Sequence, residues 1–560
     1  GLFTKPSSMT GEKMPRMQGG RAVVKALKRE GVECVFAVPG VQIMDIFDAF
    51  HGEKDLRLFT VRHEQSTIYM ADGYTRVKGK PGVGLVVPGP GVQNAMAALG
   101  TAYACSSPVL LIAGQVTSGD LGEDRGALHE VNDQLDMIRP ITKWCRRVTR
   151  PEEIPGAIHE AMEQMRTGRP RPTEVEILWD ALQKEAEIEF LPGAKDAPAE
   201  PDATDIRLAA DLLKSAKKPL IWAGGGVILA DASAELLALA EALQVPVATT
   251  PEGKGAIPED HPLSLGAWYY AFGPVRYALP EADVILAIGT RMTWQMRPFA
   301  ALHPPQKLIH VDVDSSVIGK NYPADVAVVA DAGAALRALS AEVRNRKPCP
   351  ARWPLEELNL FREKHQSWLR KRAPLQCRII DTLRKSLPAD AILVSGVTHI
   401  GYWCNLAYSV KRPRTYFTSS YFATLGFAFP LALGAKVAAP DRPVVAIVGD
   451  GGFMYALPEL ATAVRYGINL ITLVFNDQAF GSTKSEQQVH YQGRVVGTEL
   501  TNPDFSKLAE LFGARGIKAN PENLDQALRE ALPENRPVVI EVAIPTLIPP
   551  FQIPPSDVFS

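Results

Sequence analysis

The chain has 560 residues, a length that predicts three or four domains. Apolar residues make up 46% of it and charged residues 22%, which excludes a disordered chain and a coiled coil. With 60 basic and 62 acidic side chains the formal net charge is -2, so no basic bias indicates a nucleic-acid partner or an anionic membrane surface.

The apolar runs and the cysteines indicate the cellular compartment in which the protein is expected. The longest apolar runs, such as residues 108–114, have the length of strands and cannot span a bilayer. The six cysteines contain no Cys-x-x-Cys pair, which favours a reduced, cytoplasmic protein without a thiolate metal site. Residues 1–17 lack the apolar segment of a signal peptide and are interpreted as a tail or an expression remnant.

The first block, residues 18–186, alternates strand and helix patterns. Residues 58–77 predict a strand that runs into a helix, and residues 82–113 predict a strand, a helix and another strand. Two stretches rich in proline and charge, 187–205 and 344–357, are expected to be linkers.

The two later blocks repeat this alternation. The central block, 206–343, has strand-like runs and a helix pattern at 219–223, 233–243, 245–250, 284–290 and 308–313. The third block, 358–548, has them at 444–449, 457–466 and 468–477, and residues 549–560 are expected to be a tail. The predicted fold class is therefore α/β, with three consecutive doubly wound parallel-sheet domains.

Two carboxylates are expected at matching strand ends in the third block. Asp450 follows an apolar strand within a Gly-Asp-Gly-Gly turn, and Asp477 follows the next strand. A right-handed crossover would make these strands parallel neighbours, so both side chains would lie at one edge of the sheet. Carboxylates beside a glycine-rich turn suit Mg²⁺ that carries a diphosphate, although Gly-Asp-Gly alone also fits an ordinary turn.

The segment 449–481 resembles the signature of thiamine diphosphate-dependent enzymes. The family usually has Asn where Asp477 stands, so this Mg²⁺ site would carry one more negative charge. The resemblance implies metal ligation by Asp450, Asp477 and the backbone carbonyl of Ala479. The third block would then be the diphosphate-binding domain and the first block the pyrimidine-binding domain.

Glu64 stands at the start of a predicted helix in the first block. A lone acid there favours the helix dipole and needs no further role. The segment Arg-His-Glu-Gln-x-x-x-x-Met-Ala-Asp-Gly-Tyr-x-Arg around it, however, resembles the family's glutamate helix. The resemblance implies that Glu64 hydrogen-bonds the aminopyrimidine and activates the cofactor.

Further cofactor contacts are implied by the same match. Leu425 would bend the cofactor, the carbonyl of Ala423 would accept from its amino group, and Thr398 and His399 would hold the diphosphate. A core leucine and a structural histidine are the alternatives for Leu425 and His399. The remaining implied contacts are Asn94, Gly449, Gly451, Gly452, Phe480 and Gly481.

Resemblance covers residues 18–545 and is greatest to the acetohydroxyacid synthase and pyruvate oxidase group. The central block, Rossmann-like in this group, contributes the stretches 223–227, 249–266, 288–292 and 311–321. In members of related groups the pocket of this block holds FAD, holds ADP or is empty. The matching positions for FAD or another nucleotide are Gly224, Gly225, Arg291, Asp312 and Asp331.

Departures from the synthases lie in the substrate pocket. Gln295 replaces an arginine that holds the second substrate's carboxylate, with Arg297 two residues further on, and Glu486 replaces a tryptophan. Loss of a buried guanidinium partner costs about 2–5 kcal/mol of carboxylate binding, which argues against strict acetolactate synthesis. Val41 and Val87 give an apolar wall. Gln115, His129, Lys484 and Glu486 are the polar groups, and Gln115, His129 and Glu486 are the candidate proton relays.

The resemblance implies a thiamine diphosphate- and Mg²⁺-dependent lyase or transferase. It would cleave or form a carbon–carbon bond of a 2-oxo acid or acyloin through a carbanion or enamine intermediate. The alternatives are acetolactate synthase proper, an FAD-dependent 2-oxo acid oxidase, a 2-hydroxyacyl-CoA lyase-like enzyme and a catalytically silent nucleotide-binding protein. Because Glu64 and the aspartates lie on different domains, a homodimer is the expected minimal unit, usually doubled to a homotetramer.

Overall fold

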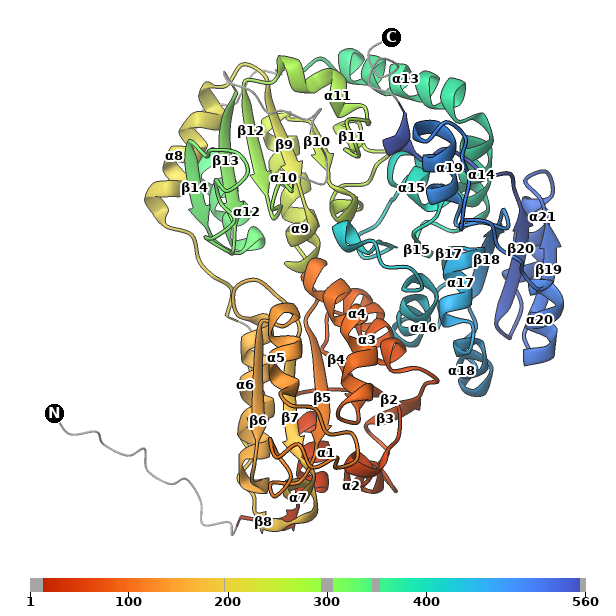
Figure 1. Cartoon of the computed structure of the whole chain (residues 1–560). Coiled ribbons are helices and arrows are strands. Elements are labelled where there is room, and N and C mark those ends of the chain that lie inside the picture. The colour runs from red at the N-terminus through yellow and green to blue at the C-terminus, as the bar shows by residue number, and fades with distance from the viewer. Residues whose placement is uncertain (1–13, 196, 294–305, 345–352, 554–560) are drawn as a thin grey trace.

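The computed structural model describes residues 14–195, 197–293, 306–344 and 353–553. They form three α/β domains, each built on a parallel sheet of six strands with helices packed against it (Figure 1). The predicted fold class is confirmed. Because parallel sheets are covered on both faces, their strands are continuous apolar runs, and β5 (Val109–Gln115) is buried along its whole length.

The N-terminal domain has the strand order β3-β2-β4-β5-β7-β6. Its other strands are β2 (Cys34–Ala37), β3 (Arg57–Thr60), β4 (Gly82–Val86), β6 (Trp144–Val148) and β7 (Thr173–Leu178). Its helices are α1 (Gly19–Arg29), α2 (Met44–Ala49), α3 (Glu64–Lys78), α4 (Pro90–Ala104), α5 (Gln134–Ile138), α6 (Ile154–Arg166) and α7 (Trp179–Gln183). The antiparallel strands β1 (Arg16–Gln18) and β8 (Glu185–Glu187) join the two ends of the domain.

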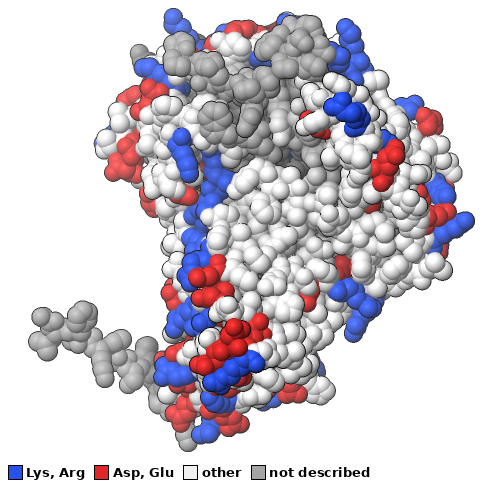
Figure 2. All heavy atoms as spheres, in the orientation of Figure 1, with Lys and Arg blue, Asp and Glu red and all other residues white. Residues whose placement is uncertain are grey.

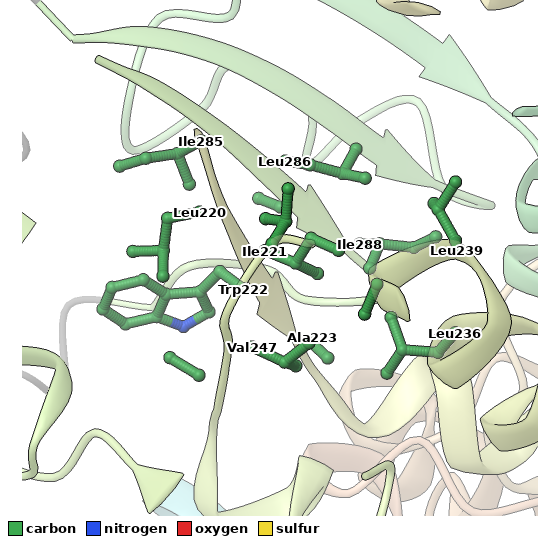
Figure 3. Close-up of a cluster of buried hydrophobic side chains, with 14 of the residues drawn as sticks. Leu220, Ile221, Trp222, Ala223, Leu236, Leu239, Val247, Ile285, Leu286 and Ile288 are labelled. Atoms are coloured by element: carbon green, nitrogen blue, oxygen red, sulfur yellow. The ribbon is translucent and has the colours of Figure 1, made fainter. Parts of the chain in front are cut away.

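The central domain has the order β11-β10-β9-β12-β13-β14. Its strands are β9 (Pro219–Ala223), β10 (Val247–Thr249), β11 (Ser264–Ala267), β12 (Val284–Ile288), β13 (Lys307–Asp312) and β14 (Val326–Val329). Its helices are α8 (Ala203–Ser215), α9 (Gly225–Leu229), α10 (Ser233–Leu243), α11 (Val275–Ala278) and α12 (Ala332–Arg344). Side chains of β9, β12 and α10 meet in its core (Figure 3).

The C-terminal domain has the order β16-β15-β17-β18-β20-β19. Its strands are β15 (Ile392–Ser395), β16 (Tyr416–Phe417), β17 (Val444–Gly449), β18 (Ile471–Asn476), β19 (Arg515–Ala519) and β20 (Val538–Ala543). Its helices are α13 (Leu355–Arg372), α14 (Pro374–Ser386), α15 (His399–Ala407), α16 (Ala428–Ala438), α17 (Asp450–Ala456), α18 (Glu459–Tyr466), α19 (Gly481–His490), α20 (Phe505–Phe512) and α21 (Leu524–Ala531).

The N- and C-terminal sheets share one topology. Counted along each domain, the strand order is 2-1-3-4-6-5 in both, whereas the central order is 3-2-1-4-5-6. In the shared order the connections diverge between the first and third strands, which are β2 and β4 in one domain and β15 and β17 in the other. Doubly wound sheets bind ligands outside the carboxyl ends of strands at such a switch point.

Helix α3 of the N-terminal domain packs so closely against α16 of the C-terminal domain that the two backbones are in contact. A Cβ atom on Gly73 would lie 1.9 Å from the carbonyl oxygen of Leu431, and one on Gly434 would lie 1.9 Å from that of Met70. Buried side chains of both helices belong to one hydrophobic cluster. This shared core fixes Glu64, the first residue of α3, relative to the C-terminal domain.

Secondary structure extends into stretches that were expected to be tails and linkers. β1 begins at Arg16 because it pairs with β8, and α8 and α13 begin at Ala203 and Leu355. The 3-10 helix Pro550–Gln552 lies in the predicted C-terminal tail, where the side chain of Gln552 hydrogen-bonds α19. No described helix is long and apolar enough to cross a membrane.

One face of the molecule carries few charges. Figure 2 shows a broad area over the N- and C-terminal domains that is nearly free of Lys, Arg, Asp and Glu. Large hydrophobic side chains of these two domains are exposed as well, among them Val41, Leu128, Phe422, Met454 and Tyr455. Tyr455, for example, keeps 52% of its surface in solvent.

Candidate cofactor site

Three helices begin at the carboxyl edge of the C-terminal sheet. Strands β15, β17 and β18 are adjacent, and the helices that follow them start at His399, Asp450 and Gly481. The first turn of a helix has free backbone N–H groups and a partial positive charge. This edge therefore favours an anion such as a diphosphate.

Asp450 and Asp477 lie at the ends of the paired strands β17 and β18. Oδ2 of Asp450 accepts hydrogen bonds from Nδ2 of Asn502 at 2.6 Å and from the backbone nitrogen of Ala479 at 3.2 Å. Oδ2 of Asp477 accepts a hydrogen bond from the hydroxyl of Thr546 at 2.7 Å. The two carboxylates are thus held in fixed orientations.

Buried charge at this edge is only partly compensated within the chain. The pKa of Asp450 is raised to about 6, chiefly by burial and further by Asp477, while the hydrogen bond from Asn502 opposes the rise. Burial lowers the pKa of His399, whose Nε2 lies 3.4 Å from Oδ2 of Asp477. Neither ring nitrogen of His399 has a well-formed hydrogen bond to a described residue.

Asp450, Asp477, His399 and Gly481 form a closely packed corner at this edge. A Cβ atom on Gly481 would lie 2.0 Å from Nε2 of His399 and 2.4 Å from Oδ2 of Asp477, so only glycine allows these two side chains their positions. Among the described residues no three His, Cys, Asp or Glu side chains gather to hold a metal. Two carboxylates and a carbonyl still fit Mg²⁺, because it typically completes its shell with phosphate oxygens and water.

The other residues matched to the cofactor surround this edge. Thr398 precedes α15 and lies close to Gly449, since a Cβ atom on that glycine would be 3.1 Å from the Thr398 hydroxyl. Phe480 packs on Gly451, where a Cβ atom would lie 2.7 Å from a carbon of the Phe480 ring. Leu425 is half-buried, with a side-chain carbon 3.8 Å from the Cβ position of Gly452. Ala423 is exposed, two residues before Leu425, with φ 48°.

Glu64 lies on the N-terminal domain with Asn94 beside it. Nδ2 of Asn94 donates to Oε2 of Glu64 at 2.9 Å. The residues that flank Glu64 contact the far end of α17 and the start of α18, where Gln65 donates to the carbonyl of Tyr455 and the backbone of His63 donates to Glu459. No hydrogen bond or ion pair joins Glu64 to Asp450 or Asp477 among the described residues.

Two of the candidate polar residues, Gln115 and His129, lie at and after the end of β5, on the carboxyl side of the N-terminal sheet. Gln115 ends β5 and is 1% exposed; its Oε1 accepts from the backbone of Val116, and its Nε2 has no partner among the described residues. His129 contacts Gln42, with Nδ1 3.1 Å from Oε1. Val87 is buried and packs against Gly40, where a Cβ atom would lie 2.1 Å from its Cγ1.

The candidate pocket residues of the C-terminal domain lie on α19. Glu486 is half-exposed, and one of its oxygens lies 3.9 Å from Nε2 of His490. Lys484 pairs with Glu499 at 3.0 Å. The structure brings neither side chain into contact with Gln115 or His129 of the same chain. Gln295 and Arg297 lie outside the described residues.

A separate cavity of about 490 Å³ lies between the N-terminal and central domains. Gly225, Arg291, Asp312 and Asp331 line it, whereas Gly224 is the residue before α9 and is not part of its wall. Figure 2 shows a band of Lys and Arg side chains where these two domains meet.

Arg169 also lines this cavity, although its sequence context does not mark it. Burial, followed by the charges of Arg291 and Arg171, lowers the pKa of Arg169 to about 10. Its buried Nη1 makes no hydrogen bond within the described chain, although it lies 3.9 Å from Oδ2 of Asp314, and the buried Nε1 of Trp268 in the same wall also lacks a hydrogen bond. Buried donors without a hydrogen bond fit an anionic ligand with polar groups.

Sequence reasoning missed Asn502, Thr546 and Gln42. Thr546 follows β20, the neighbour of β18, so the rule that ligands gather at carboxyl strand ends could have found it. Asn502 lies in the loop before α20 and Gln42 in the 3-10 helix after β2. Nothing local in the sequence marks either residue, because both contacts arise from tertiary packing.

Comparisons with known proteins agree with this architecture. Residues 17–137, 206–339 and 396–542 match the N-terminal TPP binding domain, the central domain and the C-terminal TPP binding domain of thiamine pyrophosphate enzymes. The candidate site residues Glu64, Asp450 and Asp477 lie within the stretches matched to the two TPP binding domains.

Full-length relatives are similar to the chain as well. A probable acetolactate synthase large subunit of Methanocaldococcus jannaschii is 36% identical over 552 residues, 94% of this chain and 92% of the relative. A probable 2-ketoarginine decarboxylase of Pseudomonas aeruginosa is 36% identical over 528 residues, covering 92% and 91%. Acetolactate synthase isozyme 3 large subunit of Escherichia coli is 32% identical over 554 residues, 95% of each chain. The chain therefore belongs to the acetolactate synthase-like family of thiamine pyrophosphate-dependent enzymes.

Proposed function

We propose that the protein is a thiamine diphosphate- and Mg²⁺-dependent lyase that acts on a 2-oxo acid. The observation that carries the proposal is the corner formed by Asp450, Asp477, His399 and Gly481, where three helix N-termini meet two buried carboxylates. Bound thiamine diphosphate supplies an electron sink for cleavage of the bond next to a carbonyl. The remaining roles belong to side chains of this chain.

Each residue of the corner has one task under this proposal. Asp450, Asp477 and the carbonyl of Ala479 would hold the metal, while His399 and Thr398 would donate to the diphosphate. Leu425 would fix the bend of the cofactor, and Glu64, oriented by Asn94, would share a proton with its pyrimidine ring. Gln115, His129 and Glu486 would bind the substrate and move protons.

Two chains are needed for one complete site under this proposal. The exposed hydrophobic side chains Val41, Leu128, Met454 and Tyr455 lie on the N- and C-terminal domains, which carry Glu64 and the two aspartates. A second copy in a twofold arrangement would cover these side chains and bring Glu64 of one chain to the corner of the other. Two such dimers would form a tetramer.

Decarboxylation is favoured over acetolactate formation. The arginine expected for a second substrate is Gln295 in the sequence, and the position of a pocket tryptophan carries Glu486. The relatives named as acetolactate synthases keep that reaction as the alternative, and the relative named as a 2-ketoarginine decarboxylase supports a polar or cationic donor. The half-exposed Glu486 would attract such a donor.

A substrate panel tests the proposal. The protein with thiamine diphosphate and Mg²⁺ is offered pyruvate, benzoylformate, longer 2-oxo acids, 2-ketoarginine, acyloins and a 2-hydroxyacyl-CoA, and products are identified by mass spectrometry. Carbon dioxide and the aldehyde one carbon shorter are the expected products of one of the 2-oxo acids. Acetolactate from pyruvate as the main product, or no turnover of any 2-oxo acid, would contradict the proposal.

The cavity beside the central domain favours a bound nucleotide as a second component. Its volume of about 490 Å³, its glycine-rich helix start at Gly225 and the Nη1 of Arg169, which makes no hydrogen bond within the described chain, suit the diphosphate of ADP or FAD. Denaturing the purified protein and identifying the released nucleotide by mass spectrometry distinguishes the two. Released flavin together with hydrogen peroxide formed during turnover would support the oxidase alternative.

A further inference from the structure

Gln42 and His129 meet at the switch point of the N-terminal sheet. Gln42 follows β2 and is 1% exposed, while His129 lies in the loop after β5 and is half-buried. Their contact joins Oε1 of Gln42 to Nδ1 of His129 at 3.1 Å. The same edge of the C-terminal sheet, which has the same strand order, carries the candidate cofactor site.

The orientation of the Gln42 amide is fixed by a second contact. Its Nε2 donates to the carbonyl oxygen of Leu128 at 2.9 Å. Turning the amide around would place two acceptor oxygens at that distance and lose the bond. The amide oxygen therefore faces His129, and because an amide oxygen only accepts, Nδ1 must carry the hydrogen.

We infer that Gln42 is a positioning residue that holds neutral His129 in the Nδ1–H tautomer, so that Nε2 is the proton acceptor of the ring. No hydrogen bond to Nε2 of His129 is found in the described part of the chain. Nε2 is therefore left for water or a bound molecule. The partner that sets a histidine tautomer also sets which nitrogen can do acid–base chemistry.

The loop around His129 is built to hold this arrangement. His129 has φ 65°, in the left-handed region, which a residue other than glycine adopts only where its surroundings impose it. Its carbonyl oxygen lies so close to Gly89 that a Cβ atom there would be 2.5 Å away. Gln115, at the end of the adjacent strand, buries an Nε2 that lacks a partner within the described chain and can meet a ligand at the same edge.

The catalytic meaning of this tautomer rests on the proposed function. A 2-oxo carboxylate that loses carbon dioxide takes up one proton when it leaves as an aldehyde. Nε2 of His129 can accept that proton from water and deliver it, whereas a ring fixed as Nε2–H could not accept one there. Gln42 does not touch the substrate; it acts through His129.

Nitrogen NMR of the resting protein tests the inference. Protein labelled with ¹⁵N-histidine is studied without cofactor at alkaline pH, where neutral imidazoles show which nitrogen is protonated, and His129→Gln assigns the signal. The expected signal has a protonated Nδ1 and an unprotonated Nε2. A protonated Nε2 in the wild-type protein would overturn the inference, and this result does not depend on any variant folding.

Variants at Gln42 separate the tautomer from packing. Gln42→Met keeps the size but removes the acceptor, so the signal should shift toward Nε2–H. Gln376→Met, a buried glutamine on α14, is the matched control and should leave the signal unchanged. A tautomer that Gln42→Met leaves unchanged would overturn the inference.

Kinetics connect the tautomer to turnover. Gln42→Met should lower kcat on the accepted 2-oxo acid about tenfold or more with KM little changed, because proton transfer and not binding is affected. If no 2-oxo acid is turned over, the proposed function fails, but the resting-state spectrum still decides the tautomer.

Discussion

Asn502 hydrogen-bonds Asp450 and also lies within reach of Asn476. Its Nδ2 is 2.6 Å from Oδ2 of Asp450 and 3.2 Å from Oδ1 of Asn476. One amide nitrogen thus joins the carboxyl ends of β17 and β18, between which a metal would be held. A neutral donor at this position orients the carboxylate without adding charge to it.

Replacing Asn502 is expected to weaken metal binding more than folding. In Asn502→Ala the carboxylate of Asp450 loses its shortest hydrogen bond, and the dissociation constant for Mg²⁺ at fixed thiamine diphosphate should rise about 10–100-fold. Isothermal titration calorimetry with varied Mg²⁺ measures it. Asn535→Ala, in an exposed amide pair with Asn469, is the control and should bind Mg²⁺ normally. Equal affinity of the two variants would contradict the role of Asn502.

A methyl group at Gly481 should close the diphosphate corner. Gly481→Ala would place Cβ 2.0 Å from Nε2 of His399, so His399 or the start of α19 must move. Thiamine diphosphate binding, followed by tryptophan fluorescence, should be lost while the circular dichroism of the fold remains. Gly156→Ala in α6, where a Cβ atom meets nothing within 4 Å, should bind the cofactor normally. Normal binding by Gly481→Ala would exclude this corner as the diphosphate site.

Glu174 is a buried carboxyl in β7 without a hydrogen-bond partner among the described residues. Burial, and then the charge of Glu176, raise its pKa well above the ordinary value, so the folded protein holds it protonated over a range where the unfolded chain is ionised. The folded state then binds more protons than the unfolded state. The free energy of unfolding must therefore fall as the pH rises through that range.

The variant Glu174→Leu removes this penalty. At neutral pH its free energy of unfolding should exceed that of the wild type by about 1–3 kcal/mol, and the gain should shrink as the pH falls below the ordinary glutamate pKa. Urea unfolding at several pH values measures it. Glu176→Gln is the control in the same strand; it should destabilise, because Glu176 pairs with Arg147 and accepts from Gln134. A gain that is independent of pH would contradict the account.

Mixing two inactive variants tests whether the site is shared between chains. Glu64→Gln lacks the activating acid and Asp450→Ala lacks a metal ligand, so each homodimer should be inactive. After unfolding and refolding together, each heterodimer would contain one site with both changes and one intact site. Activity should therefore return on mixing, as measured on the substrate found in the panel. Complementation would be absent if Glu64 served the corner of its own chain.

The candidate site residues that could be predicted from the sequence are the ones whose position is set by the end of a strand. Asp450 and Asp477 follow continuous apolar strands, and parallel pairing alone brings their ends together. The position of Glu64 at the start of a helix is predicted by the strand pattern that runs into a helix pattern over residues 58–77. The contacts of Asn502 and of Gln42 with His129 could not be predicted, because they depend on loop paths and on the orientation of an amide. β1 and α8 begin inside stretches that were expected to be a tail (1–17) and a linker (187–205), because pairing with β8 and capping by Asp202 order residues that composition marks as irregular.

Hydrogen–deuterium exchange at the thiazolium carbon of bound thiamine diphosphate tests the central claim most directly. With Mg²⁺ present, the wild-type protein should bind the cofactor and exchange this proton far faster than free cofactor does. Glu64→Gln should bind it equally well and exchange it slowly. Absence of binding by the wild-type protein, or equally fast exchange in Glu64→Gln, would contradict the account.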